Sequence, residues 1–169
     1  SGIASGVSYD VETNDFDVEL WGGAARSQSS RGTDSWWSNS ASIYGSLLKR
    51  SENWRLGPTL SGKLTDDNRS PNSYATGLMG VYTSQNYEIR AILTHTVTRG
   101  IDTSNTSAGD QVGNSLELAY LRALDNEWFL NLNVKNSESN KRYQSLISSD
   151  FADQTNKSNV WSVWVTKRF

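Results

Sequence analysis

The only histidine of the chain, His95, lies in the run Leu93-Thr-His-Thr-Val97 and is the residue best suited to acid–base chemistry. A histidine held by a carboxylate or amide can activate a neighbouring hydroxyl as a nucleophile. In an extended segment the residue two positions on shares the face of the histidine, and here it is Val97, which has no hydroxyl. A Ser-His-acid site would therefore need a hydroxyl from an adjoining strand and an acidic orienter, and the sequence identifies no such pair.

Other kinds of chemistry find no support in the sequence. With one histidine and no cysteine, the chain offers no ligand set typical of a zinc site. The acidic clusters at 66–67 and 102–110 lack the spacing of a calcium-binding loop that ends in glutamate. No glycine-rich phosphate loop precedes a helix, and the net charge of -2 is spread without a basic patch. We therefore expect no metal, no cofactor and no nucleic-acid partner.

The elements that must position His95 are strands, because apolar and polar residues alternate with a period of two. In the segment 87–98, for example, Ile89 and Leu93 share one face with His95 while Arg90 lies on the other. The same alternation recurs in eight segments, at residues 15–25, 37–47, 54–64, 73–84, 87–98, 112–124, 127–136 and 160–169. No stretch approaches the ~20 consecutive apolar residues that a transmembrane helix requires.

The connections between these segments predict how the strands are joined. Short connections at 50–53, 85–86 and 125–126 alternate with long polar ones at 27–35, 65–72, 99–111 and 137–159. This is typical of an outer-membrane barrel with tight periplasmic turns and longer extracellular loops. We predict an all-β fold, a transmembrane up-and-down antiparallel β-barrel of eight strands, as a single domain over residues 1–169. Residues 1–14 would form a periplasmic lead-in or extend the first strand, and ten strands are the alternative if 142–147 also pair.

Alternation alone does not reveal which face meets lipid, since a soluble lipocalin-like barrel alternates too. Aromatic residues help to decide, because amphipathic rings collect at the two membrane interfaces. On the apolar face, Phe16, Trp54, Tyr82, Tyr87, Trp128 and Phe169 fall next to short turns or termini, and Trp37, Tyr74 and Trp161 fall next to long loops. These positions predict two lipid-interface girdles in a bacterial outer membrane, with extracellular long loops and periplasmic termini. A soluble ligand-binding barrel is the alternative.

The opposite face carries charges of both signs. They are Asp17, Glu19, Arg55, Lys63, Glu88, Arg90, Glu117, Lys135 and Arg168. In a membrane barrel such residues point into the lumen, where opposite charges can pair. Because an eight-stranded barrel is just wide enough for its side chains to fill it, we expect a packed lumen rather than a general diffusion pore.

Several stretches carry a likeness to known proteins. The run 160–169 ends in Phe169 and resembles the closing strand of bacterial outer-membrane barrels, although Lys167 stands where such strands usually have an aromatic. Trp54-Arg-Leu-Gly-Pro-Thr-Leu60, the strand 77–82, Leu116-Glu-Leu-Ala-Tyr120 and Lys141-Arg-Tyr-Gln-Ser145 resemble the MipA/OmpV family of outer-membrane barrels. The chain lacks the Tyr-Phe-Gly that usually follows the last of these motifs.

The resemblance implies a non-enzymatic integral outer-membrane protein that acts as an envelope scaffold or in surface interaction. The partners it implies are outer-membrane lipid and lipopolysaccharide, the barrel-assembly machinery during insertion, and murein-processing or other envelope proteins. The family has no catalytic motif to carry over. The alternative is an outer-membrane enzyme that modifies lipid A, a PagL-like deacylase centred on His95.

Overall fold

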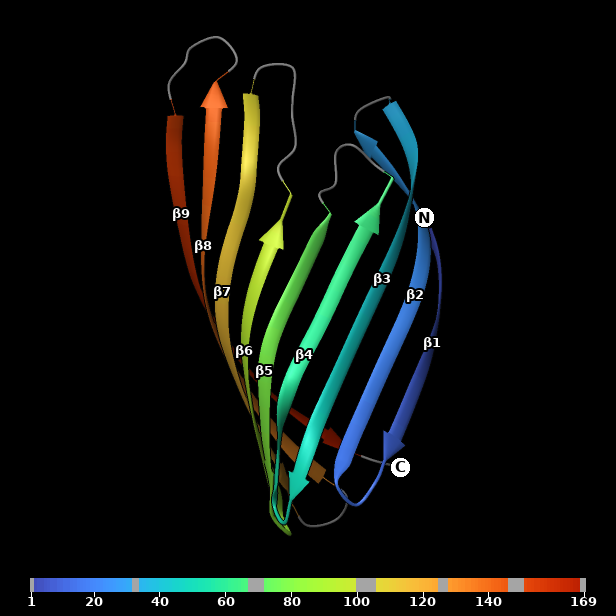
Figure 1. Cartoon of the computed structure of the whole chain (residues 1–169), viewed down its shortest axis with the longest axis vertical. Helices are drawn as coiled ribbons and strands as arrows, with labels where there is room; N and C mark the ends of the chain where they lie inside the picture. The colour runs from blue at the N-terminus through green and yellow to red at the C-terminus, as the bar shows by residue number, and fades with distance from the viewer. Residues whose placement is uncertain are drawn as a thin grey trace.

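A computed structural model describes residues 2–31, 34–66, 72–99, 106–124, 128–145 and 151–167. The described chain forms nine strands: β1 (Gly2–Glu12), β2 (Phe16–Arg31), β3 (Asp34–Ser51), β4 (Trp54–Thr65), β5 (Ser73–Thr83), β6 (Tyr87–Thr98), β7 (Thr106–Ala123), β8 (Trp128–Ser145) and β9 (Phe151–Lys167). Each strand pairs with the next one in a single twisted and curved antiparallel sheet (Figure 1). No helix in these ranges is long and apolar enough to span a membrane.

The all-β, up-and-down antiparallel fold is confirmed, but the sheet has nine strands rather than eight or ten. The ninth strand is β1, which pairs with β2 from Gly2 opposite Ser27 to Glu12 opposite Asp17. Residues 2–12 thus form a strand of their own before a tight turn, rather than a lead-in or an extension of the first predicted strand. Residues 142–145 form no separate strand either, since they continue β8.

The strands also run further than the sequence predicts, into segments expected to be loops. β2 and β3 leave only two residues between them, and β8 and β9 cover most of the predicted loop 137–159. Polar cross-strand pairs explain these extensions, because they stabilise a sheet without apolar alternation. The pairs are Ser27 with Ser38 at 3.1 Å, Asn136 with Asn159 at 2.6 Å, Ser137 with Ser158 at 2.9 Å and Asn140 with Thr155 at 2.8 Å.

The sheet has two unlike ends. We call the end that holds the β1–β2, β3–β4, β5–β6 and β7–β8 connections the short-turn end, and the opposite end the long-connection end. β1 starts at the long-connection end and β9 finishes at the short-turn end, as the arrows show (Figure 1). Because the number of antiparallel strands is odd, Gly2 and Lys167 lie at opposite ends of the sheet, which differs from the expectation that both ends of the chain lie on one side.

The two faces of the sheet differ in composition as the alternation predicts. The outer face carries Phe16, Leu20, Ile43, Leu47, Trp54, Leu56, Leu60, Tyr82, Ile89, Leu93, Leu118, Leu132 and Val163. The inner face carries Asp17, Glu19, Ser46, Arg55, Thr59, Met79, Val81, Glu88, Arg90, Glu117, Asn133 and Lys135. In β5 apolar residues stand at both odd and even positions, and Tyr82 lies on the outer face while Met79 lies on the inner face.

The buried side chains of the described chain lie on the inner face. Leu48, Met79 and Val81 form a small apolar cluster against which Ile92 packs. Since the inner face is enclosed and the outer face is exposed, the sheet curves around its inner face. Next to the cluster the backbones of β3 and β4 come close together, and a Cβ at Gly57 would collide with the carbonyl oxygen of Leu47.

We expect Gly57→Ala to destabilise the fold by about 1–3 kcal/mol, because the methyl group would push β3 away from β4. Gly22→Ala is the matched control, since nothing lies within 4 Å of a Cβ at that position. Urea unfolding followed by tryptophan fluorescence measures both. Equal stability of the two variants would contradict the close approach at Gly57.

Candidate functional site

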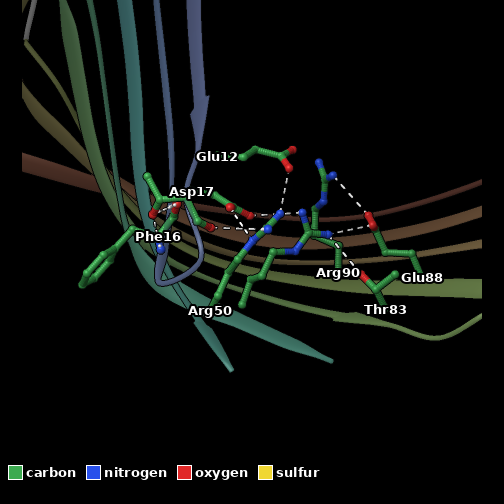
Figure 2. A network of polar contacts seen from close by, with 9 residues as sticks. Glu12, Phe16, Asp17, Arg50, Thr83, Glu88 and Arg90 are labelled. Atoms are coloured by element: carbon green, nitrogen blue, oxygen red, sulfur yellow. Dashed lines mark hydrogen bonds and ion pairs between the residues drawn. The ribbon is translucent and has the colours of Figure 1, made fainter. Parts of the chain in front are cut away.

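An ion-pair ladder of six charged side chains crosses the inner face near the short-turn end (Figure 2). Its members alternate in sign in the order Glu12, Arg50, Asp17, Arg55, Glu88 and Arg90. The nitrogen–oxygen distances along it are 2.9 Å for Arg50–Glu12, 2.5 Å for Arg50–Asp17, 3.5 Å for Arg55–Asp17, 3.0 Å for Arg55–Glu88 and 3.3 Å for Arg90–Glu88. The ladder therefore links β1, β2, β3, β4 and β6 through side chains.

Tight turns hold the ladder in place. In the β1–β2 turn the Thr13 hydroxyl donates to the carbonyl oxygen of Phe16 at 2.9 Å and accepts from its amide at 2.9 Å. The amide of Arg50 donates to the carbonyl oxygen of Asp15 at 2.7 Å, which ties the end of β3 to the same turn. The Phe16 ring points away from the charged groups, onto the outer face (Figure 2). The consecutive residues Phe16 and Asp17 thus place their side chains on opposite faces of the sheet.

The centre of the ladder is its least exposed part. The side chain of Asp17 is 14% exposed, and those of Glu88 and Arg55 are 23% and 26% exposed. Arg55 also donates to the Thr83 hydroxyl at 3.1 Å. Every charge has a neighbour of opposite sign, so the pairs offset the cost of partial desolvation. In the described ranges, no group of histidine and acidic side chains is arranged to hold a metal ion.

The predicted lumen charges that the structure describes divide into three groups. Asp17, Arg55, Glu88 and Arg90 belong to the ladder. Glu117 and Lys135 form a separate pair at 3.8 Å, and the Asn133 amide donates to Glu117 at 2.8 Å. Glu19 and Lys63 share the inner face but make no ion pair with the described residues. Arg168 lies outside the described residues.

Sequence reasoning missed two members of the ladder, Glu12 and Arg50. Arg50 falls in the predicted short connection 50–53 and Glu12 in the predicted lead-in 1–14, although the spacing of both residues already indicates the charged face. Glu12 continues the inner-face series of Asp10, and Arg50 continues that of Ser46 and Leu48. Extending each alternation by one step would have placed both on the charged face.

The outer-face aromatics form one continuous row at the short-turn end. Ring centroids lie 4.8 Å apart for Trp54–Tyr82, 5.9 Å for Tyr82–Tyr87 and 6.0 Å for Tyr87–Tyr120. The row spans β4 to β7, and it includes Tyr120, which is not among the predicted girdle residues. The sequence pattern that indicates Tyr120 as a girdle residue is the apolar series Leu116, Leu118 and Tyr120, which leads to a short turn.

The remaining predicted girdle residues have different positions. Phe16 and Trp128 share the outer face and lie at the short-turn end, where β2 and β8 begin. Trp37 and Tyr74 lie near the start of β3 and β5, at the long-connection end, and the guanidinium of Arg26 stands 4.9 Å from the Trp37 ring centroid. Trp161 does not lie beside a long loop, because β9 begins ten residues earlier at Phe151. Phe169 lies outside the described residues.

His95 lies on the outer face, and its ring bonds to a neighbouring strand. Its Nδ1 is 2.8 Å from Oδ1 of Asn114 on β7. Asn114 is an orienting partner of the kind that a catalytic histidine needs, but within the described chain the ring makes no hydrogen bond to a hydroxyl. Among the described residues, this arrangement holds an imidazole on the apolar face with no hydroxyl bonded to it.

At the long-connection end, a polar contact joins β3 to the residue that follows β4. Asp66, just after β4, accepts from the Asn39 amide at 2.7 Å and from the Asn39 side chain at 2.5 Å. These two hydrogen bonds stabilise the charged carboxylate and lower the pKa of Asp66 below its ordinary value. The contact fixes where β4 ends.

We expect Arg55→Ala to destabilise the fold by about 1–3 kcal/mol, because it leaves two partly buried carboxylates without their shared cation. Lys63→Ala removes the same charge from the same face and strand without breaking an ion pair, and should stay within about 0.5 kcal/mol of the wild type. Urea unfolding provides the comparison. A larger loss for Lys63→Ala would show that net charge, not pairing, stabilises this face.

Comparison with known proteins defines the fold and no family. No family model matches the chain, and no curated protein matches it. Among solved structures, it is similar to the outer-membrane expressed OmpT of Vibrio cholerae, with a TM-score of 0.59 and 11% sequence identity. The match covers 98% of this chain and 56% of that one, so the chain spans about half the length of its structural neighbour. The sheet thus has the architecture of an outer-membrane β-barrel wall, and the MipA/OmpV resemblance stays a prediction.

Proposed function

We propose that the nine strands form part of the wall of an integral outer-membrane β-barrel, with the outer face against lipid and the inner face towards the lumen. The observation that carries the proposal is the inverted distribution of apolar side chains. Leu60, Leu64 and Trp161 of the outer face are 53%, 65% and 75% exposed, whereas Met79 and Val81 are enclosed among the inner-face charges. Soluble monomers rarely expose so large an apolar surface, and a bilayer would cover it.

The vertical spacing of outer-face residues supports this assignment. The aromatic row marks one interface through Tyr87, and the polar His95 stands eight residues further along the same strand. Eight residues cover about 26 Å of strand, or about 20 Å along the membrane normal at a tilt of roughly 40°. That height is close to the ~25 Å apolar band of outer-membrane barrels.

The polar extensions support an extracellular position for the long-connection end. Beyond the apolar band, β8 and β9 continue with Ser137, Asn140, Thr155 and Ser158, which pair across the strands. A polar, solvated hairpin suits contact with other molecules at the surface. We therefore propose a non-enzymatic scaffold or surface-interaction role. Kinship with the MipA/OmpV barrels, and with it murein-processing or other envelope partners, belongs to the same proposal.

A PagL-like deacylase is the weaker candidate. The hydrogen bond that the His95 ring donates to the Asn114 side-chain oxygen favours it, but within the described chain no hydroxyl is bonded to that ring. The packed lumen is not part of the proposal. That expectation assumed a closed barrel of eight strands, whereas the described chain forms an open sheet of nine.

The open edges of the sheet lead to a proposal about closure. In the described chain β1 and β9 each pair on one side only. Unpaired backbone groups cost several kcal/mol each in hydrocarbon, so a membrane sheet must close. β1 and β9 run in the same direction. A hydrogen-bonded pair between them would therefore be parallel, and so would a pair between β1 of one chain and β9 of a second copy in the same orientation. We propose that an odd number of further strands completes an all-antiparallel barrel.

Leu118→Arg should cost about 2–4 kcal/mol on folding into lipid vesicles, because the cation would sit in the middle of the apolar band. Asn133→Arg on the inner face is the matched control and should be tolerated, since it faces water and Glu117. Urea titration of the folded fraction in vesicles measures both. Equal costs, or a wild-type chain that stays monodisperse in buffer without detergent, would contradict the membrane assignment.

Cysteine cross-linking tests the closure. The chain has no cysteine, so Ser8→Cys on β1 and Ser162→Cys on β9 form a clean pair of edge probes. We expect no cross-link between them with a short bifunctional maleimide, within or between chains. Ser137→Cys with Ser158→Cys should cross-link fully, because these hydroxyls lie 2.9 Å apart. Efficient cross-linking of the edge pair would show that the sheet closes with its own strands.

A further inference from the structure

A row of polar side chains crosses the outer face on five neighbouring strands. Each member lies directly opposite the next: Thr76 on β5, His95 on β6, Asn114 on β7, Glu138 on β8 and Lys157 on β9. All five are exposed. Polar groups on a lipid-facing surface are costly, so a row of five calls for a functional explanation.

The members of this polar row are held by contacts within it. Asn114 Oδ1 lies 2.8 Å from His95 Nδ1, so this nitrogen carries the proton and Nε2 is left for a ligand. Lys157 Nζ lies 3.4 Å from a carboxylate oxygen of Glu138. The row therefore presents, side by side, a hydroxyl, an imidazole, an amide, a carboxylate and an ammonium group.

A shallow depression of the outer face joins this row to apolar surface. Thr76, His95, Asn114 and Glu138 line it together with Leu78, Leu93 and Leu116. The three leucines lie directly opposite one another, one step closer to the short-turn end. One side of the depression is thus apolar and lies within the membrane band, while the other is polar and lies at its boundary.

We propose that this depression binds one phosphorylated glycolipid of the outer leaflet, with an acyl chain on the leucines and the headgroup along the polar row. The inference rests on the proposed function, because it needs this face in a bilayer. The Lys157 ammonium suits a phosphate, and His95 Nε2, Glu138 and Asn114 accept hydrogen bonds from sugar hydroxyls. Four strand spacings of ~4.8 Å make the row about 19 Å wide, which suits a glycan headgroup rather than a single glycerophosphate.

The geometry favours binding over hydrolysis. The hydroxyl that faces His95 across the strands belongs to Thr76, and no hydrogen bond joins it to the ring in the described chain. Asn114 keeps the ring oriented, which serves a hydrogen bond from a headgroup hydroxyl to Nε2 as well as it would serve catalysis. The row then anchors the protein to its lipid neighbours at a fixed depth.

Binding of lipopolysaccharide to the chain in detergent, followed by native mass spectrometry, tests the inference. His95→Leu and Asn114→Leu should each weaken binding about fivefold, since each removes one hydrogen-bonding group. Both variants make the outer face more apolar and so preserve insertion. Thr96→Leu, on the inner face of the same strand as His95, is the matched control and should bind as the wild type does.

The outcomes separate this inference from the proposed function. Folded His95→Leu and Asn114→Leu proteins that bind lipopolysaccharide as tightly as the wild type overturn the site. Phosphatidylglycerol is the comparison lipid, and equal His95-dependent binding of both lipids overturns the glycolipid assignment. A wild-type chain that does not insert into vesicles overturns the membrane barrel itself, whereas insertion with His95-independent binding overturns the glycolipid site alone.

Discussion

The antiparallel hydrogen-bond ladder is the interaction on which everything else in this structure depends. Because each strand pairs residue by residue with the next, with one break in register between Ala108 and Gln111, the faces stay separated from β1 to β9. A slip of one residue would exchange the apolar outer-face set and the charged inner-face set on the strand concerned. The aromatic row and the ion-pair ladder are therefore two consequences of a single register.

The charged and apolar parts of the inner face support each other. Arg55 lies opposite Val81, so its guanidinium reaches Asp17 and Glu88 from beside the apolar cluster. The cluster limits the water around the centre of the ladder, which strengthens the ion pairs there. In return, the ladder satisfies the charges that would otherwise prevent apolar packing on this face.

The sequence predicted the fold where apolar alternation is strong and failed where pairing is polar. In β6 the series of Ile89 and Leu93 was enough to assign both faces. In β8 and β9, Ser137 and Ser158 pair through hydroxyls, a pattern that composition cannot distinguish from a loop. β1 was not predicted as a separate strand, because the sequence does not show that its residues pair with those of β2. Glu12 and Arg50 were missed since they lie at strand ends, where turn residues and strand residues look alike.

Strand parity changes what the ladder does. A closed eight-stranded barrel would bury these charges among side chains from every direction, and their desolvation would be large. If further antiparallel strands complete the barrel, its lumen is wider and the inner face borders water on one side. In the open nine-stranded sheet about half of the Arg90 side chain is exposed. In such a wall the ladder does not fill the lumen. It joins neighbouring strands at the short-turn end, where the turns connect β1 to β2 and β3 to β4 but leave β2 and β3 without a connection.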